Sequence, residues 1–371
     1  MQVSIINPVV ATEIITAFLL IALAVSAKKK SAEGFFSLAL TQELKGLAIL
    51  MIIFSHLGFF LATDNHFLWP LSLWAGVGVN LFLFLSGFGL MASQLRKNLG
   101  VKEFYRRHLS KIFLPLWLSL TVILILDAWL LKLYYPWPEV IKSFFGFFPR
   151  ADIDLNINSP LWYITPTVFY YLLFPIIFRP KLSWLTAPII FLLSWCIIRL
   201  NPLFLVDVIK LYKLHYWVFP IGVLFGWLVF APSLDLWRER GLRQLKKIQS
   251  LWSWPGCRFA AIAMLIAAVA YFTAHAGIGE KPWLEQAVSL LTVALFMMLF
   301  MVNRWRFGLL SLFGLYSFEI YLWHWPLAYH FDFLFRFLPA WLALPLYLTV
   351  LVCLAVLSRK VLGLRSLKLK K

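Results

Sequence analysis

Apolar stretches of about 17–25 residues, each long enough to cross a lipid bilayer as an α-helix, recur from one end of the chain to the other. This pattern predicts an all-α fold, a polytopic bundle of about eleven transmembrane helices. The predicted helices lie near residues 9–27, 38–62, 71–92, 112–132, 161–178, 183–199, 215–231, 259–276, 284–302, 309–330 and 340–358. Of the 371 residues, 62% are hydrophobic and 13% are charged, about half the charged share of a typical soluble domain.

The basic residues predict the orientation of the bundle. Most of the 34 Lys and Arg residues fall in alternate loops, beginning with Lys28–Lys30, and basic loops stay in the cytoplasm. We therefore expect a multi-pass protein of the plasma (inner) membrane, surrounded by membrane lipids, with its N-terminus outside and its C-terminus cytoplasmic. The net charge of +18 follows from this distribution, which excludes nucleic acid as a partner.

Two loops are long enough to carry a role of their own. Residues 133–160 fall on the outside. Residues 232–258 fall inside and place apolar residues at near-helical spacing among basic ones, which predicts a helix on the inner leaflet. This helix is either an anchor on anionic lipid or the flank of an entry path for an anionic cofactor.

Polar side chains inside membrane spans are costly, so each is a candidate functional residue. The spans contain few of them: Lys45, His56, Asn80, Asp127, Glu319 and His324. Lys45 and His56 are eleven residues apart, just over three helical turns, so they share one helix face and lie roughly 16 Å apart along the axis. Imidazole acts as a base or nucleophile near neutral pH, although a histidine in a span can also simply bond a neighbouring helix.

The loop after the third predicted span is strongly basic. The sequence "QLRKNLGVKEFYRRHLSK" (94–111) includes Arg106, Arg107 and Lys111. The positive-inside rule alone accounts for such a loop. The functional alternative is a site for the phosphates of a nucleotide such as coenzyme A, because guanidinium groups suit phosphate and lysine adds point charge.

The segment "FGLYSFEIYLWHWPLAYH" (313–330) supplies the last group of candidates. Tyr321 and His324 share a helix face, whereas Glu319 is about 140° from His324 and must face another helix or a wet cavity. The alternative for this segment is an aromatic belt in which His324 reaches the membrane surface. The glycine-rich segment 76–91 favours close helix packing over phosphate binding. Cys196, Cys257 and Cys353 are scattered without metal-binding spacing, and no metal is expected.

Four segments, in the same order as in the family, resemble the acyltransferase-3 family of integral-membrane enzymes. They are "LKGLAILMIIFSH" (44–56), "NLFLFLSGFGLM" (80–91), "SPLWYITPTVFYYLLFP" (159–175) and "LYSFEIYLWHWPL" (315–327). The resemblance implies cytoplasmic acyl-CoA as the donor and an essential histidine, here His56. It also implies a basic residue eleven positions earlier, usually arginine, which here is Lys45. The basic pair before the next span has altered spacing in this chain.

Together these features predict an O-acyltransferase that moves an acyl group, expected to be acetyl from acetyl-CoA, to a hydroxyl of an extracytoplasmic or lipid-linked glycan. His56 is the predicted catalytic residue, as a base or as a carrier of the acyl group. The predicted acyl-CoA-binding residues are Lys45, Arg106, Arg107 and Lys111, and the predicted acceptor or supporting residues are Glu319, Tyr321 and His324.

The predicted organisation has two parts. Residues 1–37 form an additional N-terminal transmembrane helix with a basic cytoplasmic linker, and residues 38–371 form the acyltransferase domain. A glycan transporter or flippase is the alternative function, because the same polar groups could line a transport path.

Overall fold

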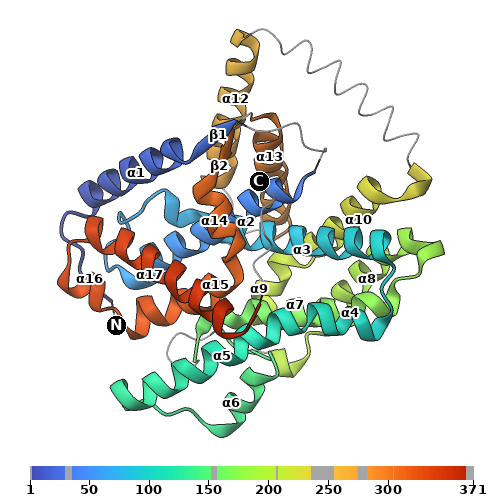
Figure 1. Ribbon diagram of the computed structural model, residues 1–371, viewed down its shortest axis with the longest axis horizontal. Helices are drawn as coiled ribbons and strands as arrows, with labels where there is room; N and C mark the ends of the chain where they lie inside the picture. The colour runs from blue at the N-terminus through green and yellow to red at the C-terminus, as the bar shows by residue number, and fades with distance from the viewer. Residues whose placement is uncertain are drawn as a thin grey trace.

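The computed structural model describes residues 2–29, 36–151, 157–205, 208–234, 255–274, 282–303 and 305–364, which are mostly helical (Figure 1). The first helices are α1 (Pro8–Val25), α2 (Leu38–His56), α3 (Ala75–Lys97), α4 (Val101–His108), α5 (Ser110–Leu126), α6 (Trp137–Phe144), α7 (Ile164–Ile177), α8 (Thr186–Leu200), α9 (Val208–His215) and α10 (Val218–Phe230). The later ones are α12 (Pro255–Ala274), α13 (Pro282–Val302), α14 (Gly308–Leu315), α15 (Ser317–Trp325), α16 (Phe333–Phe337) and α17 (Ala340–Val361).

Nine helical segments of the described chain are long and apolar enough to cross a membrane. Two further predicted spans are present in shorter pieces. The apolar part of α12 is Phe259–Phe272, and the span expected at 309–330 is divided between α14 and α15 at Tyr316, whose backbone leaves the helical region. The all-α, polytopic class is therefore confirmed, although 309–330 is not one continuous helix.

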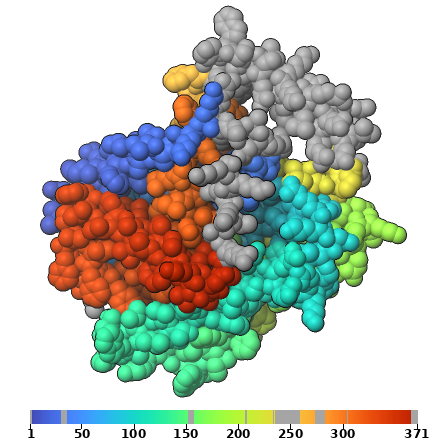
Figure 2. Space-filling view, in the orientation of Figure 1, coloured from blue at the N-terminus to red at the C-terminus, as the bar shows by residue number. Residues whose placement is uncertain are grey.

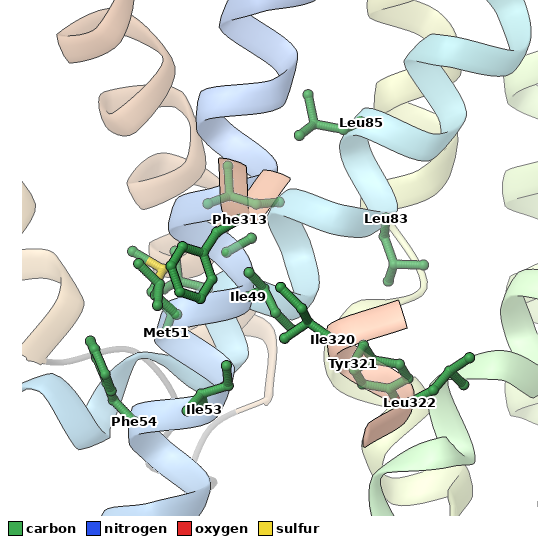
Figure 3. Packing of buried hydrophobic residues seen from close by; sticks show 14 of the residues in the cluster. Ile49, Met51, Ile53, Phe54, Leu83, Leu85, Phe313, Ile320, Tyr321 and Leu322 are labelled. Carbon is green, nitrogen blue, oxygen red and sulfur yellow. The ribbon is translucent and has the colours of Figure 1, made fainter. Parts of the chain in front are cut away.

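Helices α2 and α3 form the centre of the bundle. In both, 72% of the most apolar window is buried, against 17% in α1, whose apolar side chains mostly face outward. Ser37 caps the start of α2 by accepting a hydrogen bond from the Leu40 amide, and β-branched and aliphatic residues continue the helix to His56. Figure 3 shows Ile49 of α2 beside Ile320 of α15 in this core. In Figure 2, α1 (blue) and α17 (red) occupy one edge of the visible face, and α5 and α6 (green) form another.

Glycines bring the central helices into backbone contact. A Cβ on Gly46 of α2 would collide with the Leu310 carbonyl of α14, and a Cβ on Gly314 would collide with the Gln42 carbonyl of α2. In the glycine-rich segment 76–91, Gly87 meets the backbone of α10 in the same way. The packing interpretation of that segment is therefore confirmed, since small residues let membrane helices approach closely.

Two short strands tie distant helix ends together. Strand β1 (Ala27–Lys29) pairs antiparallel with β2 (Trp305–Phe307), so the end of α1 and the end of α13 lie on one side of the bundle, as the alternation of spans predicts. We call this the Lys45 side, because α2 begins there, and the opposite side the His56 side. The N-terminal residue Val3 bridges to Ala62 on the His56 side. Most of the predicted inner-leaflet helix at 232–258 lies outside the described residues.

Candidate active site

Two histidines from separate helices meet on the His56 side of the core. His56 is the last residue of α2, and its Nδ1 lies 2.8 Å from Nε2 of His324 in α15. The rings stack with their centroids 5.1 Å apart and an angle of 14° between their planes. His324 is only 1% exposed, so the alternative in which it reaches the membrane surface is wrong.

The hydrogen bonds of this pair define which nitrogen carries each proton. Nδ1 of His324 lies 2.6 Å from the Tyr321 carbonyl oxygen, and a carbonyl only accepts, so His324 donates from Nδ1. Its Nε2 is then an acceptor in the neutral ring, and His56 must donate from its own Nδ1. The remaining nitrogen of His56, Nε2, therefore carries a lone pair and can take a proton.

Bonds between helices fix α15 in place around this pair. The Tyr321 hydroxyl donates to the Pro160 carbonyl, and the Tyr347 hydroxyl donates to the His324 carbonyl. The Asn158 amide donates to the Leu322 carbonyl at 3.0 Å. Tyr321, predicted as an acceptor or supporting residue, thus positions the backbone that binds His324, and its ring packs on His324 at 5.5 Å.

His56 lines a cavity of about 440 Å³. Its wall combines aromatic rings with a few polar groups, the usual composition of a small-molecule site. The aromatic and polar side chains of this wall include His56, Tyr321, Trp325, Trp162, His215 and Ser289. Rings of Phe60 and Trp325 meet His56 edge-on, at 5.8 and 5.4 Å, and shield the histidine pair on that side.

A cluster of cations gathers on the Lys45 side. Lys45 is half-buried in α2, and the charges that act on it come from Lys111 of α5 and Arg359 of α17. Lys111 is also within electrostatic range of Lys97 and Arg107. Because like charges repel, such a cluster favours the binding of an anion with several negative charges.

A comparison with protein families identifies the domain that contains both sites. The model of an acyltransferase domain matches residues 44–360, well over half of the chain. The chain belongs to the acyltransferase-3 family. The matched range includes Lys45, His56, His324 and Arg359, so both sites lie within the acyltransferase domain. No curated protein and no solved structure matches the chain significantly.

Glu319 of this acyltransferase binds Arg359. The guanidinium contacts the carboxylate with two nitrogens, at 2.7 and 3.0 Å, and lies 4.7 Å from the centre of the Tyr316 ring. Arg359 also donates to the Leu315 carbonyl at the break between α14 and α15. In the sequence Arg359 is one basic residue among several near the C-terminal end, and nothing local distinguishes it. A buried glutamate in one span, which needs a cation from another helix, is the signal that could have identified it.

The basic residues of the loop at 94–111 of the acyltransferase differ in their surroundings. Arg106 and Arg107 both contact Glu103 in α4, and Arg106 is largely exposed, with 77% of its side chain accessible. Lys111 lies one helix later and belongs to the cluster with Lys45. The loop therefore brings Lys111 and Arg107 toward the cations of α2 and α17, whereas Arg106 faces outward.

Asn80 and Asp127, the other polar residues noted in predicted spans, are both buried and hydrogen-bonded. Asn80 bonds His215 and Ser289, and Asp127 bonds His330 at 3.0 Å and the Tyr135 hydroxyl at 2.8 Å. Burial and the Asp127 carboxylate raise the pKa of Tyr135, so this phenol stays protonated and donates. In the described part of the acyltransferase, His, Cys, Asp and Glu nowhere form a group of three that could hold a metal.

Proposed function

We propose that this acyltransferase takes an acyl group from acyl-CoA, expected to be acetyl-CoA, on the Lys45 side. It transfers the group to a hydroxyl of a glycan or lipid-linked saccharide that enters from the His56 side. The observation that carries the proposal is the hydrogen bond of His56 to His324 at the wall of the cavity, from which we infer a free lone pair on His56 Nε2. His56 lies roughly 16 Å along the axis of α2 from the Lys45 cluster, a distance that suits the extended arm of a coenzyme A thioester.

In the proposed reaction His56 is the general base. The acceptor hydroxyl gives its proton to Nε2 while its oxygen bonds to the thioester carbonyl carbon. The carbon–sulfur bond then breaks, and the leaving coenzyme A sulfur takes the proton from the imidazolium. The products are an ester and a free thiol, and His56 returns to its neutral form. His324 is a positioning residue, because it holds His56 through Nδ1 and stabilises the charge that His56 gains.

The donor phosphates fit the cation cluster. Lys45, Lys111 and Arg359 come from three different helices and meet on one side of the bundle. Glu319 keeps the guanidinium of Arg359 in place, so we assign Glu319 a supporting role on the donor side. The location of acyl-CoA in the cytoplasm supports the proposed orientation, with the C-terminus cytoplasmic and the N-terminus outside the plasma (inner) membrane. Membership of an acyltransferase family favours this function over transport of a glycan.

The test of the reaction centre is the variant His56→Ala in purified protein. Release of coenzyme A and acyl transfer should fall by at least about 10²–10⁴-fold, the usual contribution of general acid–base catalysis. Binding of coenzyme A, measured by calorimetry, should stay close to that of the unchanged protein. The exposed His66, on the loop after α2, provides the control, and His66→Ala should keep full turnover. Near-normal turnover of His56→Ala would show that the histidine pair only packs helices.

The test of the donor site compares two basic residues of one loop. Lys111→Ala should raise the KM for acetyl-CoA about 2- to 5-fold, as expected for an exposed ion pair, while Arg106→Ala should leave it unchanged. Lys45→Ala should weaken donor binding more, by about 10-fold, because Lys45 is half-buried. Lys45→Arg should be tolerated because it keeps the charge. Equal effects of Lys111→Ala and Arg106→Ala would mean that the loop acts only through its total charge.

A further inference from the structure

The cavity has a second group of polar side chains, apart from the histidine pair and not used in the proposed reaction. His215 ends α9, and Ser289 lies in α13. Both line the cavity with His56, and both are more than nine-tenths buried. Behind them Asn80 of α3 is 1% exposed. Three helices therefore converge to place buried polar groups at this wall.

The hydrogen bonds of this wall fix the protonation of His215. Oδ1 of Asn80 lies 2.7 Å from Nδ1 of His215, and the amide nitrogen of Asn80 donates to the Ser289 hydroxyl. Because the amide oxygen only accepts, His215 donates from Nδ1, and its Nε2 carries a lone pair. No hydrogen bond among the described residues involves this Nε2, and because His215 lines the cavity, we infer that Nε2 faces it. An acceptor of this kind at a cavity wall is satisfied when a ligand or water donates to it, and leaving it without a donor is costly.

Aromatic rings connect the two histidine walls. The ring of Trp162 stacks on His215, with centroids 5.8 Å apart and planes at 24°, and meets Tyr163 edge-on. Tyr163 in turn meets Tyr321, which packs on His324. The cavity thus has aromatic rings between two histidine acceptors, and Ser55, Ser159 and Glu285 also line it. A sugar ring has an apolar face that can pack on the aromatic rings and several hydroxyls that can donate to both histidines. A simple alcohol has a single hydroxyl for the two acceptors.

We propose that His215 is an acceptor-binding residue, held by Asn80 and Ser289, whose Nε2 accepts a hydrogen bond from a second hydroxyl of a glycosyl ring while the reacting hydroxyl faces His56. This inference rests on the proposed acyl transfer to a saccharide and assigns its specificity to a particular side chain. A site that bonds a substrate hydroxyl rejects analogues without that hydroxyl, because its buried polar atom is then left without a partner.

The first experiment compares acceptors that share one alkyl chain. Protein in lipid nanodiscs is given [¹⁴C]acetyl-CoA with octyl glycosides of glucose, galactose, mannose or N-acetylglucosamine, each below its critical micelle concentration, or with 1-octanol. We expect at least one glycoside to be acetylated more than 10-fold faster than octanol, or to alter the release of coenzyme A where octanol does not. If octanol matches every glycoside in both measurements, the inference is wrong.

The second experiment uses His215 variants with the preferred glycoside. His215→Ala should raise the KM of the glycoside about 3- to 10-fold, the effect of one lost hydrogen bond, and leave the KM for acetyl-CoA unchanged. His215→Gln, which places an amide oxygen near the position of Nε2, should restore most of the affinity, and His66→Ala is the matched histidine control. An unchanged glycoside KM in His215→Ala, or an equal loss in His215→Gln, would overturn the assignment.

Donor measurements separate this inference from the proposed function. If the unchanged protein neither binds acetyl-CoA nor releases coenzyme A, the acyl-CoA function fails, and the role of His215 fails with it. If the unchanged protein handles the donor normally and only the His215 result differs from expectation, the proposed function stands and the acceptor assignment alone is refuted.

Discussion

His56 donates its Nδ1 hydrogen bond to a neutral imidazole, whereas in many acid–base sites the histidine donates this bond to a carboxylate. Nε2 of His324 accepts from Nδ1 of His56, and the bond from the other nitrogen of His324, Nδ1, to the Tyr321 carbonyl fixes this tautomer. A carboxylate at this depth would add a buried charge, which is costly in a low-dielectric interior. An imidazole fixes the same tautomer of His56 without that charge. The pair therefore suits a reaction in which charge exists only briefly, in the transition state.

The role of His324 predicts a difference between two substitutions. His324→Gln keeps an oxygen that accepts from Nδ1 of His56, whereas His324→Ala removes the acceptor. We expect kcat to fall about 10- to 10³-fold in His324→Ala, less than the loss for His56→Ala, and to recover substantially in His324→Gln. Turnover should be measured together with thermal unfolding. If both variants lose activity equally while remaining folded, His324 does not set the tautomer of His56.

Helix α2 is the element that joins the two sites. It is continuous from Leu38 to His56, so the half-buried cation and the catalytic candidate are separated by a fixed length of helix. Its position against α14 is set by backbone contact at Gly46 and Gly314. Because α14 ends at the break that begins α15, this contact also positions the helix that carries His324. Packing at the glycines and geometry at the histidines are therefore coupled.

Gly314→Ala tests this coupling. The added Cβ would collide with the Gln42 carbonyl, so the two helices must separate, and overpacking of this kind costs about 1–3 kcal/mol. We expect a lower Tm in detergent and reduced turnover. Gly89→Ala in α3 is the matched control, because its Cβ would meet no atom within 4 Å, and it should leave both measurements unchanged. Equal behaviour of the two variants would contradict the close contact between α2 and α14.

Across the whole molecule, the two sites lie toward opposite sides of the bundle. The cation cluster shares its side with the β1–β2 pair, and the histidine pair lies near the end where Val3 meets Ala62. In the proposed function, basic residues on one side both orient the chain during insertion and attract an anionic donor. The same charges thus support the topology and, in the proposed function, the supply of substrate.

The orientation predicts opposite labelling of two introduced cysteines. In a background with Cys196, Cys257 and Cys353 replaced, an impermeant thiol reagent added to intact cells should label Asn65→Cys, on the His56 side. It should not label Lys102→Cys, on the Lys45 side, until the membrane is permeabilised. Both positions are exposed in the structure. Labelling of Lys102→Cys in intact cells would reverse the proposed orientation and remove the Lys45 side from the cytoplasmic donor.

The helical class, the approximate spans and the polar residues worth examining could all be predicted from the amino-acid sequence. This is possible because a helix that crosses a bilayer must be long and apolar, and because polar residues in such a helix are costly and therefore rare. Helix periodicity also placed Lys45 and His56 on one face of a single helix, and α2 is indeed continuous through both. The predicted roles of Lys45, Arg106, Arg107 and Lys111, and the division at residue 37, stay predictions.

Which of these residues contact one another depends on how the helices pack. His56 and His324 are 268 positions apart in the sequence, and Glu319 binds Arg359 of α17, which is 40 positions away. Periodicity describes the face of one helix and contains no information about which face of another helix lies against it. His215 escaped notice for the same reason, since a histidine at the edge of a span looks like an interfacial residue until Asn80 and the cavity are placed beside it. Packing of the helices, and not the local pattern, assembled the site.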